Sequence, residues 1–483
     1  MYVGIDLGTS GVKATLVDDT DRVVASGSAP LDVSRPRPQW SEQDPADWWR
    51  ATSSAVASLR EKTNLGAVRG VGLSGQMHGA TLLDKSSTAL RPAILWNDNR
   101  STEACAQLEA RVEDFRAICG NLAMPGFTAP KLLWVREHEP EIFARVHRVL
   151  LPKDFLRLQM TGDCATDLAD ASGTLWLDVK ERDWSETLLD ACGLSREAMP
   201  KLFEGSEVTG TLRPEIAEAW GMPRVPVAAG GGDQAAGAIG AGVIEPGEAS
   251  LALGTSGVLF VAGDRFRPFP ERAVHAFCHA LPDRWHQMSV ILSAASCLSW
   301  VTRLTGARDE AALLGEIEAV DRPADRLLFL PYLSGERTPH NDARAAGVFY
   351  GLRHDTDRAE LGRAVLEGVA FALADGQQAL VDSGTVIGEV SVIGGGARSP
   401  LWGRILASAL GRPLATRSGA EVGPALGAAR LARMAVTGEA PESACSKPPV
   451  SHIAEPDPAL SDLYSERLAT FRRLYANLQG EWS

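Results

Sequence analysis

The sequence of 483 residues predicts an α/β protein made of two duplicated domains. The first observation is a repeat, because Leu7-Gly-Thr-Ser-Gly-Val12 recurs letter for letter as Leu253-Gly-Thr-Ser-Gly-Val258. A chance identity of six residues has a likelihood of roughly one in a hundred at this composition, so duplication is the better explanation. The second observation is that short runs rich in Val, Ile and Leu alternate with helical patterns, which is typical of α/β domains. The copies lie about half a chain apart, and we therefore divide the chain into residues 1–245 and 246–483.

Each half is expected to begin with a β-hairpin whose tip is Gly-Thr-Ser-Gly. In the first half, this tip and an Asp-rich turn separate apolar runs at 2–6, 12–17 and 22–25, which predicts an antiparallel meander. In the second half, apolar runs at 249–253 and 258–261 flank the second copy of the tip.

The later elements follow from start signals and apolar spacing. Asp44 and Pro45 mark the start of a helix over 46–62. The segment from Pro441 to Pro458 is rich in proline and predicts a surface loop. Further strands are expected at 68–73, 93–96, 225–229 and 387–393, and further helices at 400–410 and 460–478.

The composition excludes several classes of protein. Hydrophobic residues make up 45% and charged residues 23%, which excludes disorder as the main state. The 48 basic and 61 acidic side chains give a formal charge of −13, so nucleic acid is not an expected partner. No apolar run approaches the roughly 18 residues that span a bilayer, so no membrane is expected either. The N-terminus lacks a signal-peptide pattern and the seven cysteines form no CxxC pair, which favours a cytoplasmic protein.

The two hairpin tips are candidate phosphate-binding sites. Glycine and small hydroxyl residues let backbone N–H groups approach a phosphate without obstruction. One such tip alone would be interpreted as a tight turn. The duplication favours instead two tips that bind a polyphosphate from opposite sides. The candidate residues are Gly8, Thr9 and Ser10 in the first tip and Gly254, Thr255 and Ser256 in the second.

Asp6 is a candidate magnesium residue because it directly precedes the first tip. A carboxylate there would repel a phosphate unless a cation lay between them, and Mg²⁺ is usually held by one or two carboxylates plus phosphates. Lys13 on the returning strand would either neutralise phosphate charge or remain an ordinary solvated lysine.

Asp233 is a candidate catalytic base. It lies in a glycine-rich turn, Gly230-Gly-Gly232-Asp233-Gln234, between an expected strand and a small-residue segment. The glycines also match a permissive dinucleotide fingerprint, but a carboxylate in that turn would repel the pyrophosphate. A helix N-terminus would instead keep Asp233 ionised and able to accept a hydroxyl proton. A plain helix N-cap is the other interpretation.

A polar loop after the strand at 68–73 is a candidate substrate site. Gln76 and His78 can hydrogen-bond sugar hydroxyls, and Met77 offers an adaptable apolar contact. A polar loop without a ligand is an equally consistent interpretation. Gly395 and Gly396, after the strand at 387–393, leave room for a flat ring against the backbone.

Together these segments resemble the FGGY carbohydrate kinases of the actin, hexokinase and heat-shock chaperone superfamily. The matching motifs are 6–13 and 253–257 for phosphate, 394–398 for adenosine, and the signatures at 128–138 and from 347–352 to 360–367. The resemblance implies two ribonuclease-H-like domains of the actin/hexokinase type with an interdomain cleft. It also implies ATP as co-substrate, Mg²⁺, and a homodimer.

Within the family, the segments at 76–79, 95–98, 151–154 and 335–341 are most similar to the members that phosphorylate D-xylulose at its 5-hydroxyl. That similarity implies that Met77 and His78 contact the sugar, that Asp233 is the proton acceptor, and that Asp6 is needed for activity. Gln234 stands where many such kinases carry Asn after the aspartate. The alternatives are a kinase for another ketose or polyol such as ribulose, and an ATP-switched chaperone-like or filament protein. An NAD-dependent oxidoreductase ranks third.

Overall fold

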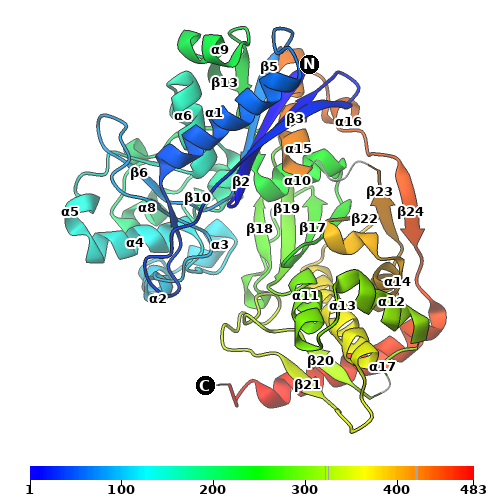
Figure 1. The fold of residues 1–483 in the computed structure, drawn as a ribbon. Helices are drawn as coiled ribbons and strands as arrows, with labels where there is room; N and C mark the ends of the chain where they lie inside the picture. The colour runs from blue at the N-terminus through cyan, green and yellow to red at the C-terminus, as the bar shows by residue number, and fades with distance from the viewer. Residues whose placement is uncertain (321, 325, 419–422, 483) are drawn as a thin grey trace.

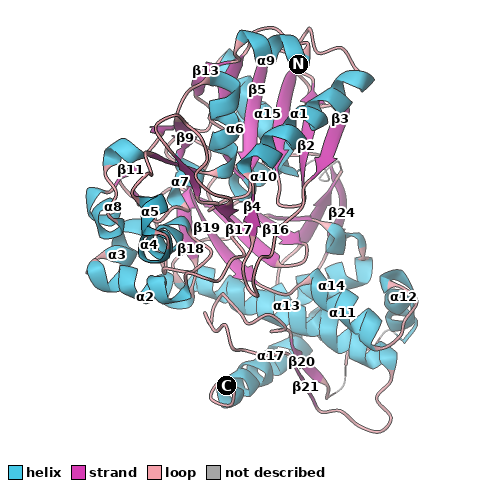
Figure 2. Ribbon diagram, turned by 60° about the vertical axis from the view of Figure 1, so that its left-hand side comes forward, coloured by secondary structure: helices cyan, strands magenta, loops and turns pink. Residues whose placement is uncertain are grey.

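The computed structural model describes residues 1–320, 322–324, 326–418 and 423–482, and it contains two large mixed sheets (Figures 1 and 2). The sheet of the N-terminal half begins with an antiparallel meander of β3, β2 and β1. β5 and β14 then run parallel to β1, and β13 is antiparallel at the edge. In order across the sheet, the strands are β3 (Val23–Pro30), β2 (Gly11–Val17), β1 (Tyr2–Leu7), β5 (Gly70–Gly75), β14 (Pro226–Ala228) and β13 (Val208–Thr211).

The sheet of the C-terminal half repeats this order and these directions. Its strands are β19 (Trp285–Ile291), β17 (Gly257–Gly263), β16 (Ala249–Leu253), β22 (Val390–Ile393), β23 (Leu414–Arg417) and β24 (Val450–Ala454). The first three form a meander, β22 and β23 run parallel to β16, and β24 is antiparallel. β18 (His275–Cys278) extends this sheet beyond β19. The predicted two-domain α/β fold class is therefore confirmed.

The identical hexapeptides form hairpins of different register. Leu7 pairs with Val12, whereas Leu253 pairs with Gly257. The second tip is one residue shorter, although Gly11 and Gly257 each also pair with a third strand, β3 and β19 respectively. The sequence repeat predicted two hairpins, and the structure has both, but their backbones are not copies of one another.

Helices cover both faces of the N-terminal sheet. α1 (Pro45–Lys62) packs against β2 and β3. α15 (Gly423–Thr437) comes from the far end of the chain and packs against β1 and β5, where Figure 1 shows it in orange beside the blue strands. The approach is close, because a Cβ atom on Gly4 would lie 1.8 Å from the carbonyl oxygen of Ala425. A division at residue 245 places the two sheets in different halves, but α15 belongs to the second half and packs on the sheet of the first. The domain boundary itself stays a prediction.

The two halves also share a hydrophobic core. An α-helical insertion between β5 and β14 packs its apolar side chains against Phe260, Phe277 and Val290 of the C-terminal sheet. The insertion includes α2 (Thr102–Arg111), α3 (Phe115–Cys119), α4 (Thr128–His138), α6 (Pro152–Thr161), α7 (Leu168–Ser172) and α8 (Glu186–Cys192). The other face of the C-terminal sheet packs against α13 (Arg358–Asp382). Its outer helices are α11 (Ala295–Leu304), α12 (Glu310–Val320), α14 (Pro400–Leu410) and α17 (Pro458–Leu478).

One expected loop contains regular structure. The proline-rich segment from 441 to 458 forms α16 (Pro441–Ala444) and then β24, which pairs with β23 at the sheet edge. β24 was missed because four of its five residues are exposed, so it carries no apolar signal of a buried strand. Among the described helices, none combines the length and the apolar character needed to cross a membrane.

Candidate active site

Adjacent strands bring Asp6 and Asp233 together around Ser74. Asp6 of β1 is in register with Ser74 of β5, and Gly231 of β15 (Gly231–Gly232) is in register with Ser74 on the other side. β15 ends at Gly232, so Asp233 becomes the first residue of α10 (Asp233–Ala241). Burial and, to a smaller extent, the charge of Asp6 together raise the pKa of Asp233 to about 7. Burial also raises the pKa of Asp6 to about 6, against the opposing effects of Ser74 and Lys13.

The glycines before Asp233 are explained by close packing. Gly230 has φ +82°, and a Cβ atom there would lie 1.9 Å from the carbonyl oxygen of Leu73. A Cβ atom on Gly232 would lie 2.7 Å from Cγ of Met77. The N-cap of α10 is Gly232, and the Asp233 side chain accepts the N–H of Gln234 at 2.9 Å. Asp233 is therefore not the helix cap. The glycines allow close packing against β5 and against the loop at 76–79, the candidate substrate site, which we call the substrate loop.

His78 is held in a defined position and protonation state. Its backbone is left-handed, with φ +70°, and its carbonyl oxygen accepts hydrogen bonds from Nζ of Lys131 (2.9 Å) and Oγ1 of Thr128 (3.2 Å). The ring Nδ1–H donates to the carbonyl oxygen of Gly173 at 2.8 Å, which leaves Nε2 as an acceptor. Burial lowers the pKa of His78 to about 3, so the ring is neutral. Met77 lies beside it and is buried.

Gln76 makes two side-chain hydrogen bonds within the protein that the sequence did not predict. Its side chain is 3% exposed, its Nε2 donates to Oε1 of Gln43 (2.9 Å), and its Oε1 accepts from Oγ1 of Thr9 (2.9 Å). The indole N–H of Trp96 also donates to Oγ1 of Thr9 at 3.0 Å. Gln76 thus ties the substrate loop to the first hairpin tip. Sequence reasoning missed Gln43 and Trp96 because glutamine and tryptophan at these positions carry no spacing signal.

The remaining predicted residues lie at two hairpin tips and one glycine turn. Lys13 is in register with Asp6 across β1 and β2. Ser10, Gly254 and Thr255 are exposed, while Gly8, Thr9 and Ser256 are half-buried. Gly395 and Gly396 follow β22, which pairs with β16, and a Cβ atom on Gly396 would lie 2.9 Å from Cβ of Leu253. The glycine turn therefore adjoins the second hairpin.

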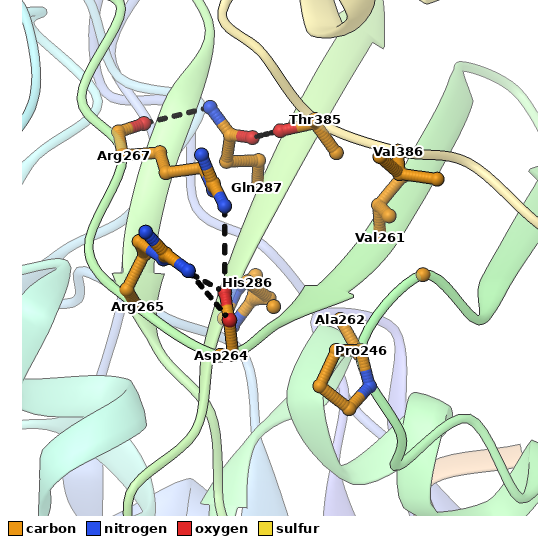
Figure 3. Close-up of a pocket in the computed structure, with 12 residues that line it drawn as sticks. Pro246, Val261, Ala262, Asp264, Arg265, Arg267, His286, Gln287, Thr385 and Val386 are labelled. Atoms are coloured by element: carbon orange, nitrogen blue, oxygen red, sulfur yellow. Dashed lines mark hydrogen bonds and ion pairs between the residues drawn. The ribbon is translucent and has the colours of Figure 1, made fainter.

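A separate cavity of about 180 Å³ lies on the C-terminal half (Figure 3). Asp264 at its mouth forms ion pairs with Arg265 and Arg267, and Gln287 hydrogen-bonds Thr385 on the opposite wall. None of the predicted site residues lines this cavity, so it is distinct from the candidate active site.

Two duplicated sheets that hold an acidic pair near glycine-rich hairpins define a nucleotide-dependent phosphotransferase of the actin/hexokinase type. Residues 1–240 match the N-terminal domain, and residues 249–436 the C-terminal domain, of the FGGY family of carbohydrate kinases. The chain belongs to this family and is a carbohydrate kinase.

Relatives with known names are similar over their full length. A xylulose kinase from Escherichia coli (strain K12) is 56% identical over 482 residues, which cover 99% of each chain. The crystal structure of a kinase from Brucella ovis superposes with a TM-score of 0.96 at 50% identity, covering 99% of both chains. The crystal structure of a xylulose kinase from Rhodospirillum rubrum has a TM-score of 0.92 at 30% identity, again over 99% of both chains.

Proposed function

We propose that this kinase transfers the γ-phosphoryl group of ATP to the 5-hydroxyl of D-xylulose. One observation carries the chemistry: Asp233, with a pKa of about 7, lies beside the loop that holds Met77 and His78. A general base is most effective when its pKa is near the working pH. The sugar assignment is supported by the 56% identity to the xylulose kinase from E. coli.

In the proposed reaction, Asp233 orients the 5-hydroxyl and accepts its proton. The hydroxyl oxygen forms a bond to the γ-phosphorus as the bond to the β-phosphate oxygen breaks, and ADP leaves. Met77, neutral His78 and Gln234 are proposed to contact the sugar. Gln76 is proposed to position the first hairpin tip, because its amide bridges Thr9 and Gln43, and its second N–H and second lone pair remain for the sugar.

The nucleotide is proposed to lie between the two halves. Gly8, Thr9, Ser10 and Lys13 would meet the phosphates from one side and Gly254, Thr255 and Ser256 from the other, with Gly395 and Gly396 against the adenosine. Mg²⁺ would neutralise phosphate charge during transfer. Asp6 fits that ion, because its Oδ1 is buried without a hydrogen-bond partner and would accept from a metal-bound water. Among the described residues, no group of three or more acidic, His or Cys side chains could hold a metal alone.

A panel of acceptors tests the assignment. ADP release is coupled to NADH oxidation with D-xylulose, D-ribulose, glycerol and xylitol as acceptors. We expect the highest kcat/KM with D-xylulose, and a higher value with D-ribulose or a polyol would overturn the sugar assignment. ATP turnover independent of any sugar would favour the chaperone-like alternative. We further propose a homodimer and a cytoplasmic location, which light scattering and cell fractionation test.

A further inference from the structure

Arg337 is placed by a chain of hydrogen bonds that begins at Asn121. The buried Asn121 amide donates from Nδ2 to the carbonyl oxygens of Cys119 (2.8 Å) and Ala276 (3.0 Å), which orients its Oδ1 as an acceptor. His275 lies 3.0 Å from that oxygen through Nδ1, so Nδ1 carries the proton and Nε2 is an acceptor. Nη1 of Arg337 is 3.4 Å from Nε2 of His275. The guanidinium orientation therefore follows from a buried side-chain amide.

Arg337 has no close ion pair in the part of the chain that the structure describes. No Asp or Glu among the described residues forms an ion pair with it. Burial lowers the pKa of Arg337, and the charge of the neighbouring Glu336 opposes that effect from beyond ion-pair distance. The Oε1 of Glu336 instead accepts the backbone N–H groups of Leu292 (2.9 Å) and Arg337 (2.8 Å). A half-buried cation without an ion pair is costly, and such a cost is typical of residues kept for a ligand. None of its nitrogens is a buried atom without a partner, so its remaining donors reach solvent.

Arg337 faces the substrate loop from the C-terminal half. The ring of His275 stacks on Phe277 at 5.6 Å, and the His78 ring lies 6.5 Å from the same Phe277. The positive charge of Arg337 lowers the pKa of His78. The charge of Asp6 acts on Asp233 instead, at the Ser74 end of the loop. Asp6 and Asp233 thus lie beside the stretch from Ser74 to Met77, whereas Arg337 approaches the loop on the His78 side, through His275 and Phe277.

The proposed reaction requires an open-chain sugar. A 2-ketopentose closes its ring through O5, which here must be free to attack phosphorus. The bound ketose must therefore present a C2 carbonyl at the end remote from Asp233. A carbonyl oxygen only accepts hydrogen bonds, and a guanidinium only donates them.

We propose that Arg337 is a specificity-determining residue that donates hydrogen bonds to the C2 carbonyl oxygen of the ketose. This inference rests on the proposed function. It assigns one end of the sugar to each half of the protein: Asp233 of the N-terminal half takes the reacting hydroxyl, and Arg337 of the C-terminal half takes the carbonyl. Ketose binding then joins the two halves, whereas xylitol lacks the carbonyl and offers Arg337 only a hydroxyl, whose oxygen accepts a hydrogen bond but whose proton must also find an acceptor.

The experiment compares Arg337→Met, Arg337→Lys and the wild-type full-length enzyme. We measure kcat/KM for D-xylulose, the KM for ATP, and the inhibition constant of xylitol. Loss of a hydrogen bond from a charged group predicts a fall in kcat/KM for D-xylulose of about 10- to 100-fold in Arg337→Met. The inhibition constant of xylitol and the KM for ATP should change less than about threefold, and Arg337→Lys should recover part of the loss.

The controls separate the possible failures. Arg344→Met removes an exposed arginine from the same loop and should behave as wild type. Equal losses for D-xylulose and xylitol, or a loss confined to the KM for ATP, would overturn the proposal. If Arg337→Met does not fold, the same comparison on Arg337→Lys decides it. A wild-type enzyme that does not use D-xylulose would defeat the proposed function, whereas an active wild type with an unchanged Arg337→Met defeats only the role of Arg337.

Discussion

Asp6 and Asp233 lie on either side of Ser74, close enough that the charge of Asp6 raises the pKa of Asp233. The two side chains have the same chemistry, but their neighbours differ. Asp6 faces Lys13 and the first hairpin tip, whereas Asp233 adjoins Met77 and the substrate loop through Gly232. In the proposed reaction, Asp6 therefore acts on the phosphate side and Asp233 is the base on the sugar side.

Asp233→Asn should fold, bind ATP and D-xylulose, and lose turnover by at least about 100-fold, since general-base catalysis contributes on that order. Coupled ADP release measures turnover, and calorimetry measures binding. Asp264→Asn, an exposed aspartate at the separate cavity, is the control and should leave the rate unchanged. A rate for Asp233→Asn within tenfold of wild type would remove the assignment as base.

The rate should depend on pH through Asp233. Because its pKa is raised to about 7, kcat/KM should rise with pH below about 7 and level off above it. The same shift makes the folded protein bind more protons than the unfolded chain between the ordinary carboxyl pKa and about 7. The contribution of Asp233 to stability therefore falls as pH rises through that window, and Asp233→Asn should melt at a higher temperature than wild type at pH 8. Equal melting temperatures at pH 8 would contradict this.

Asp6→Asn should lose most activity, with only partial recovery in excess Mg²⁺. Removing the Asp6 charge should also lower the pKa of Asp233, so the residual kcat/KM should reach its plateau at a lower pH than in wild type. Titration of the rate against Mg²⁺ and against pH checks both. An unaffected rate would exclude a role of Asp6 in metal binding. If kcat/KM reached its plateau at the same pH as in wild type, the effect of the Asp6 charge on the pKa of Asp233 would be excluded.

Gln76→Met distinguishes positioning of the hairpin from contact with sugar. The substitution removes the amide that bridges Oγ1 of Thr9 and Oε1 of Gln43, so the first tip should be held less firmly. We expect the KM for ATP to rise more than the KM for D-xylulose. Steady-state kinetics with each substrate varied in turn measures both constants. A rise confined to the sugar constant would restore Gln76 as a sugar ligand.

Gly427→Ala tests the crossing of α10 and α15. A Cβ atom on Gly427 would lie 1.7 Å from the carbonyl oxygen of Ala236 in α10, and we expect destabilisation of about 3 kcal/mol or failure to fold. Gly315→Ala is the matched control, because this exposed helical glycine has open space around it. It should gain about 0.5–1 kcal/mol from helix propensity. Urea unfolding measures both, and equal midpoints for the two variants would contradict the tight crossing.

The sequence predicted the parts of the fold that have strong local signals. The duplicated tip, the meander at its sides and the helix over 400–410 are all present, because turn glycines and apolar spacing act over a few residues. β24 was missed because its side chains are exposed and polar. The equal topology of the two sheets followed from the repeat, but the one-residue difference in hairpin register did not, since the two hexapeptides are identical in sequence.

The candidate site was predicted less completely than the fold. Asp6, Met77, His78 and Asp233 lie close together, because Asp6 is the penultimate residue of β1 and the other three follow β5 or β15 of the same sheet. The engagement of Gln76 and the chain from Asn121 to Arg337 depend on contacts between segments far apart in sequence. No spacing rule connects position 121 with position 275 or 337, so only the folded structure reveals them.

The place of α15 has a consequence for how the chain is made. The face of the first sheet that contacts Ala425, Ala428 and Ala429 stays uncovered until the ribosome has released almost the whole polypeptide. The two halves have related sheets, yet neither completes its core from its own segment. Maturation of the N-terminal half therefore waits for the last quarter of translation, and early termination near residue 245 would leave an apolar sheet face open to aggregation.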